Sequence, residues 1–79
     1  MRFYKITCIE GINEELETAI CEILDVKYMY SLDDVSCEVV TDKPCEVAKE
    51  VLNTMVVEEL NRRESELYNY LARTRMNYA

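Results

Sequence analysis

The stretch VKYMYSLDDVSCEVVT, residues 26–41, decides how this chain of 79 residues folds. Residues 26–32 and 35–41 each alternate between two faces and are rich in β-branched and aromatic side chains, which is typical of half-buried strands. Asp33 and Asp34 lie between them and predict the two-residue turn of a β-hairpin, although a longer loop stays open because Asp-Asp is a weaker turn signal than Asn-Gly. In the two-residue register the pairs on the apolar face are Leu32–Val35, Tyr30–Cys37, Tyr28–Val39 and Val26–Thr41.

The segment before the hairpin begins with another predicted strand. Residues 2–9 (RFYKITCI) alternate, and we expect the face that carries Tyr4, Ile6 and Cys8 to point inward. Gly11, the only glycine, ends this strand, as glycine does where a chain must turn.

Residues 12–24 then change to the helical period. Asn13 is a suitable N-cap, and Glu14 and Glu15 behind it favour the positive end of the helix dipole. A helix of this length is marginal alone and must bury its apolar stripe. The stripe consists of Ile12, Leu16, Ala19, Ile20, Ile23 and Leu24.

A long final helix is predicted to start after Asp42 and Lys43, with Pro44 in its first turn. Its apolar stripe is Val47, Ala48, Val51, Leu52, Met55 and Val56. Beyond residue 60 the stripe thins, but strong helix formers continue. The helix is therefore expected either to run on past residue 70 or to bend near residues 61–63.

This order of elements predicts one α+β domain over residues 1–79, with a βαββα body at 1–60 and a helical extension at 61–79. A right-handed crossover makes strands one and two parallel, and strand three fills the gap between them. The expected sheet is three-stranded and mixed, in the order 1-3-2, with two helices on one face. It resembles a ferredoxin-like arrangement without its last strand, so strand one is expected to be an exposed edge.

The composition excludes much chemistry. The chain has no His, and one Gly is too few for a glycine-rich phosphate loop. Without an imidazole base, an activated nucleophile or a cofactor loop, we expect a protein that is no enzyme and binds no cofactor. No apolar run approaches the ~18 residues of a membrane span, and no leader opens the chain, so we expect a cytoplasmic protein without membrane contacts.

The four cysteines, Cys8, Cys21, Cys37 and Cys45, have no Cys-x-x-Cys spacing. That spacing is typical of zinc ribbons and thioredoxin-like redox sites. The sequence therefore predicts no bound metal and no structural disulfide.

Charge is the most informative feature of the sequence. Residues 10–60 hold 14 acidic side chains against three lysines, and the solvent face of the first helix carries only carboxylates: Glu14, Glu15, Glu17, Glu22 and Asp25. A solvated helix normally mixes signs, because like charges at i,i+4 repel. We expect this face to bind a basic protein surface, such as the phosphate-binding groove of a nucleic-acid enzyme. The alternative is that the net charge of −7 only keeps the protein soluble.

The C-terminal segment is the second candidate contact. Residues 61–79 carry a net charge of +2, and tyrosines lie among the arginines. Such a surface could bind RNA or a partner protein. The candidate contact residues for a partner or a dimer are Leu67, Tyr68, Tyr70, Leu71, Arg73 and Arg75.

Small acidic single domains of this kind are similar in size and charge to phage-encoded inhibitors of host defence, such as anti-CRISPR and anti-restriction proteins. The similarity implies a nucleic-acid mimic that occupies a basic surface of a nucleic-acid-binding enzyme or complex in the host cytoplasm. One alternative is a self-associating, dimeric interaction module. The other is an RNA or DNA binder that acts through the Arg/Tyr segment.

Overall fold

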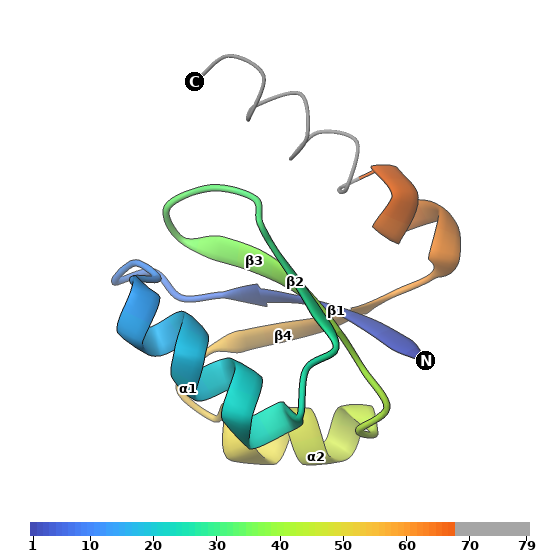
Figure 1. The fold of residues 1–79 in the computed structure, drawn as a ribbon, viewed down its shortest axis with the longest axis horizontal. Coiled ribbons are helices and arrows are strands. Elements are labelled where there is room, and N and C mark those ends of the chain that lie inside the picture. The colour runs from blue at the N-terminus through green and yellow to red at the C-terminus, as the bar shows by residue number, and fades with distance from the viewer. Residues whose placement is uncertain (68–79) are drawn as a thin grey trace.

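The computed structural model describes residues 1–67. Their elements are β1 (Arg2–Thr7), α1 (Glu14–Leu24), β2 (Tyr28–Ser31), β3 (Ser36–Thr41), α2 (Cys45–Val51) and β4 (Val56–Leu60). Residues 62–67 are also helical. Residues 1–67 therefore form a small α+β domain with a four-stranded antiparallel sheet and three helices (Figure 1).

The strands lie in the order β2-β3-β1-β4. β1 pairs antiparallel with β3 on one side and with β4 on the other, and β3 pairs antiparallel with β2. β1 and β2 consequently run parallel with β3 between them, which confirms the predicted order of these three strands.

The fourth strand overturns three predictions. α2 ends at Val51, because the cap residue Leu52 leaves helical geometry at φ −110° and ψ 45°. The Met55 N–H then donates to the Leu52 carbonyl at 3.0 Å and turns the chain. Residues 56–60, which begin with two β-branched valines, then pair with β1 and satisfy the backbone groups that β1 turns away from β3. The long final helix, the three-stranded sheet and the exposed first strand were therefore wrong, and the edge strands are β2 and β4.

The hairpin is present, but its register is shifted by one residue from the predicted pairing. Tyr30 lies opposite Glu38 rather than opposite Cys37. The turn causes the shift, because the Asp33 carboxylate accepts hydrogen bonds from the Val35 N–H at 2.9 Å and from a serine hydroxyl at 2.8 Å. This Asx-type turn holds a longer loop than the two-residue turn.

The register shift changes which side chains of β2 face the core. A slip of one residue moves a strand's whole set of side chains to the other face. Met29 packs against the core, whereas Tyr28 and Tyr30 share the opposite face with Glu38 and Val40. The predicted inward position of the two tyrosines was therefore wrong.

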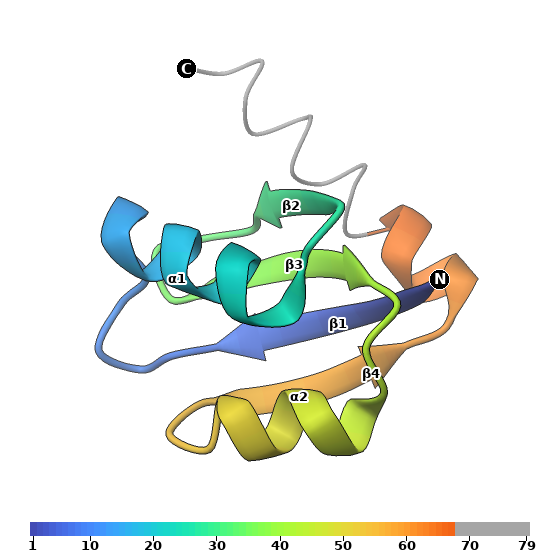
Figure 2. The same cartoon turned by 60° about the horizontal axis from the view of Figure 1, so that its bottom comes forward.

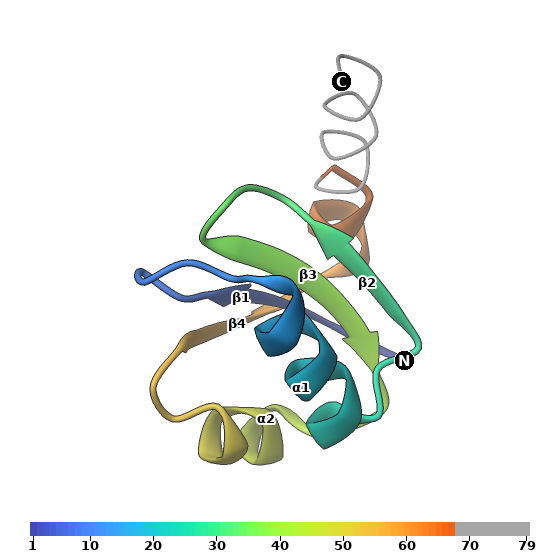
Figure 3. The ribbon, with the colours of Figure 1, turned by 60° about the vertical axis from the view of Figure 1, so that its left-hand side comes forward.

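The core lies between one face of the sheet and helices α1 and α2, which both cover that face (Figures 2 and 3). The inward face of β1 is the predicted one, with Tyr4 and Ile6 fully buried. The complete cluster of buried residues is Tyr4, Ile6, Ile20, Leu24, Cys37, Val39, Ala48, Leu52 and Val57.

The other face of the sheet carries the third helix. Residues 62–67 follow β4 and lie on the side away from α1 and α2 (Figure 1). Ser65 of this helix is buried against β3, whose six residues are all buried. Within the described residues, no helix is long and apolar enough to cross a membrane.

Candidate protein-binding surfaces

Helix α1 is held at both ends by the caps that the sequence provides. The Asn13 side chain accepts a hydrogen bond from the Leu16 N–H at 2.9 Å, which confirms the predicted N-cap. At the other end Asp25 adopts the left-handed conformation at φ 49° and ψ 55°, and its N–H donates to the Cys21 carbonyl. The helix runs over the 11 residues Glu14–Leu24, which corresponds to about 16 Å along its axis at 1.5 Å per residue.

Four of the five predicted acidic residues share the outer face of α1. At 3.6 residues per turn they fall within an arc of about 100°, opposite the buried Ile20 and Leu24. All four are exposed: Glu14, Glu15, Glu22 and Asp25. α1 has no basic residue in its sequence, and none of these four carboxylates forms an ion pair with any residue from 1 to 67.

Glu17, the fifth predicted acidic residue, does not share the exposed outer face of α1. It is half-buried and lies on the flank of α1, where its charge acts on two thiols. Burial raises the pKa of Cys37 to about 12, and the charge of Glu17 adds to the rise. The pKa of Cys21 is also raised, first by burial and then by Glu17. The structure therefore does not place Glu17 on the exposed acidic face.

All four cysteines are free thiols. Cys37 is buried in the core, and the other three are half-buried. The Cys21 thiol lies 3.9 Å from the Met29 sulfur, a contact typical of soft packing rather than of a reactive site. No group of three or more metal-ligating side chains occurs in the part of the chain that the structure describes.

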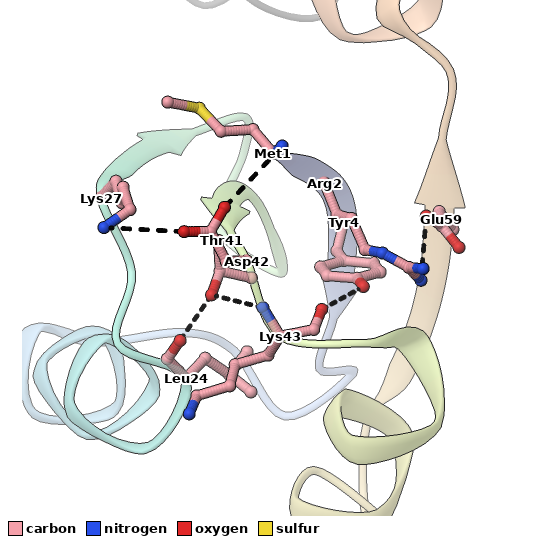
Figure 4. A network of polar contacts seen from close by, with 9 residues as sticks. All are labelled: Met1, Arg2, Tyr4, Leu24, Lys27, Thr41, Asp42, Lys43 and Glu59. Carbon is pink, nitrogen blue, oxygen red and sulfur yellow. Dashed lines mark hydrogen bonds and ion pairs between the residues drawn. The ribbon is translucent and has the colours of Figure 1, made fainter.

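A polar network joins α1 to the rest of the domain at its C-terminal end (Figure 4). The buried Thr41 hydroxyl donates to the Leu24 carbonyl at 2.5 Å and accepts from the Lys43 N–H at 3.3 Å. The Tyr4 hydroxyl donates to the Lys43 carbonyl at 2.5 Å. These bonds connect the end of α1, β3, β1 and the loop that precedes α2, so the acidic face is held on a rigid support.

Leu67 is the one residue of the second predicted contact that the structure describes. Its side chain is 57% exposed, as a protein contact requires. The remaining predicted residues, Tyr68, Tyr70, Leu71, Arg73 and Arg75, lie outside the described residues.

Glu38 is a buried polar residue that the sequence analysis missed. It is fully buried on the sheet face away from α1 and α2, and Ser65 donates a hydrogen bond to its Oε1. Its Oε2 accepts no hydrogen bond from residues 1–67. Burial raises the pKa of this carboxyl, and the Ser65 hydrogen bond opposes the rise. The adjacent valines Val39 and Val40 could have indicated this burial, because a strand buried on both faces has apolar residues at successive positions.

A surface hollow was also missed, because residues 54–56 were expected to be helical. It lies where the β1–α1 loop meets the start of β4. Ile9 is 88% exposed and Val56 is 51% exposed, so two large apolar side chains of its lining face solvent. The lining residues are Thr7, Cys8, Ile9, Glu10, Thr54 and Val56.

Comparison of the chain with protein-family models, with curated proteins and with solved structures finds no match in any of the three.

Proposed function

We propose that this protein is a small, non-enzymatic binding domain whose acidic helix face occupies a basic surface of a nucleic-acid-binding enzyme or complex. The acidic face is the exposed set Glu14, Glu15, Glu22 and Asp25 on α1. The observation that supports the proposal is that these four carboxylates share one face without a cation on the helix or an ion pair to residues 1–67.

The electrostatic cost of this face favours a binding role over a role in solubility alone. Glu22 and Asp25 are three residues apart, a spacing at which like charges destabilise a helix by roughly a few tenths of a kcal/mol. The same net charge could be spread over the surface without that cost. Such a face would also speed the encounter with a basic partner.

The order and pairing of the strands support a finer classification of the fold. The βαββαβ order, with strands arranged β2-β3-β1-β4, fits a ferredoxin-like arrangement that includes the last strand. This classification carries no function, because unrelated functions occur on the same fold.

Two variants with equal charge changes test the acidic face. Glu15→Lys with Glu22→Lys changes the outer face of α1, and Glu46→Lys with Glu50→Lys changes exposed positions of α2. Each pair brings the formal charge from −7 to −3. Wild-type and variant proteins are immobilised and incubated with a nuclease-treated lysate, and bound proteins are eluted with double-stranded DNA.

The proposal expects DNA to release nucleic-acid-binding proteins from the wild type and from the α2 variant but not from the α1 variant. If both variants lose the DNA-released proteins equally, the cause is general charge steering, which acts mainly on the association rate. If both variants still retain these proteins as the wild type does, the proposal is contradicted.

Self-association is the second candidate function, and the exposure of Leu67 favours it. A dimer that uses this residue should dissociate when Leu67→Glu places a charge in the contact. Light scattering of the two proteins checks this. A wild type that is monomeric at all concentrations would contradict the dimer, and a mobility shift with RNA or DNA would favour the nucleic-acid alternative instead.

A further inference from the structure

Strand β4 is an edge strand, with no strand on its outer side in the described residues (Figure 2). An edge presents backbone N–H and C=O groups that a further strand can pair with. α2, rather than α1, runs alongside β4 (Figure 2). This edge is therefore a surface separate from the acidic face of α1.

The hydrogen-bond pattern shows which backbone groups of β4 point outward. The Cys8 N–H donates to the Val35 carbonyl at 2.7 Å, in continuation of the β1–β3 register. Residues of an antiparallel strand bond alternately to one side and the other, so Tyr4 and Ile6 bond to β3, and the residues between them bond to β4. The partners of Phe3, Lys5 and Thr7 in β4 are Leu60, Glu58 and Val56.

Val57 and Glu59 therefore direct their N–H and C=O groups away from the sheet. The two residues are the intervening positions of β4, and two donors and two acceptors along this edge are available to another strand. β4 is five residues long, which corresponds to about 17 Å of extended chain.

The exposed side chains along this edge are acidic and favour a basic strand. Glu58 and Glu59 are adjacent and lie on opposite faces of the sheet, and Lys5 of β1 lies opposite Glu58. Glu59 is paired with Arg2 at 3.7 Å between exposed side chains (Figure 4). Exposed pairs of this kind contribute little to stability. At the start of the strand Val56 faces the hollow that also contains Ile9.

A second copy of β4 is a poor occupant of this edge. Antiparallel pairing of all five residues with their copies would place Glu58 opposite Glu58 and Glu59 opposite Val57. Like charges directly opposite each other destabilise a strand pair. The edge thus disfavours its own copy and favours a strand of opposite charge.

We propose that the outer edge of β4 binds an extended segment of a partner protein that carries two adjacent basic residues between apolar ones. Its backbone pairs with Val57 and Glu59, and its basic side chains lie opposite Glu58 and Glu59. One of its apolar side chains covers Val56 and Ile9. This binding mode is β-strand addition, in which the main chain supplies affinity and alternate side chains supply specificity.

The probe is a synthetic peptide, acetyl-Thr-Val-Lys-Arg-Thr-Ile-Thr-amide, tested together with its reversed sequence so that both strand directions are covered. A peptide with Glu in place of Lys and Arg is the control. Amide hydrogen exchange of the full chain is measured by NMR with and without peptide. In the free protein the Val57 and Glu59 amides should exchange quickly, while those of Val56 and Glu58 exchange slowly.

Saturating basic peptide should slow exchange at Val57 and Glu59 by tenfold or more, and the acidic peptide should have no effect. The proposal is overturned if these two amides are already protected in the free protein, if no peptide binds at 1 mM, or if the peptide binds without protecting them. The last result would place the peptide elsewhere on the acidic surface. The variant Glu15→Lys with Glu22→Lys should keep the protection, so this test is independent of the acidic-face proposal.

Two substitutions at one position separate the charge from the backbone donor. Glu59→Gln removes the charge and should weaken peptide binding about two- to fivefold. Glu59→Pro also removes the outward N–H and should weaken binding about fivefold further. Equal affinities for the two variants would contradict strand addition. If Glu59→Pro does not fold, as judged by circular dichroism, the exchange measurement on the wild type still decides.

Discussion

The hydroxyl of Ser65 donates a hydrogen bond to Oε1 of Glu38 on the sheet face that α1 and α2 leave open. Glu38 is fully buried between neighbouring strands, opposite Lys5 of β1 and Tyr30 of β2. The bond joins the third helix to the centre of the sheet, although 27 residues separate its partners in sequence. The other oxygen of this buried carboxylate, Oε2, accepts no hydrogen bond from residues 1–67. The strength of the contact therefore depends on the protonation of Glu38, and hence on pH.

Glu38→Gln should stabilise the fold at neutral pH. The folded pKa of Glu38 is raised above its ordinary value of 4.5, so the folded state binds more protons than the unfolded chain. The free energy of unfolding therefore decreases as the pH rises from about 4.5 through the folded pKa. The amide removes this decrease, and we expect a gain of about 1–2 kcal/mol at pH 7.

Urea titrations of the wild type and Glu38→Gln between pH 4 and pH 8 measure this effect. Glu50→Gln, which changes the same charge at an exposed position of α2, is the control. Equal pH slopes for Glu38→Gln and the wild type would show that Glu38 does not change its protonation on folding.

Thr41→Val should destabilise the domain by about 2–3 kcal/mol without changing its shape. Valine has the volume of threonine, but it leaves the Leu24 carbonyl and the Lys43 N–H without their buried partner. Thermal unfolding measures the loss. The control is Thr54→Val at an exposed position, for which little change is expected. A small effect of Thr41→Val would mean that water replaces the hydroxyl.

Leu52→Ala and Val51→Ala should differ strongly. Leu52 is 3% exposed and part of the core, so its truncation leaves a cavity and should cost about 2–5 kcal/mol. Val51 precedes it but is 44% exposed, and its truncation should cost well under 1 kcal/mol. Chemical denaturation compares the two variants. Similar losses would show that α2 packs with a different face toward the sheet.

Cys37 should resist alkylation in the folded protein. Burial raises its pKa to about 12, so almost none of the reactive thiolate exists at pH 8. Treatment with iodoacetamide followed by peptide mass spectrometry should label the half-buried Cys8 and Cys45 first. Cys37 should react only after denaturant is added. Early labelling of Cys37 would indicate local opening of β3.

The sequence by itself determined the helix cap, the glycine turn and the buried faces of two strands, because each depends only on residues close together in the chain. Asn13 caps α1 as expected, because an N-cap bond spans three residues and needs no distant partner. β1 ends at Thr7, before Gly11, and Gly11 adopts φ +102° in the turn between β1 and α1, a conformation that favours glycine wherever it lies in a fold. The alternation of β3 and the apolar face of β1 were also sufficient to place Cys37, Val39, Tyr4 and Ile6 in the core.

Only the tertiary structure decided the remainder. Residues 56–60 fit both a helical stripe and a strand, and they became β4 because β1, some fifty residues earlier, had backbone groups to pair with. The buried position of Glu38 was not predicted, and its hydrogen bond comes from Ser65, which a distant segment brings to the sheet. The outward groups of Val57 and Glu59 exist only once that pairing has formed. Strand pairing is non-local, so a short segment cannot specify its partner or its register alone.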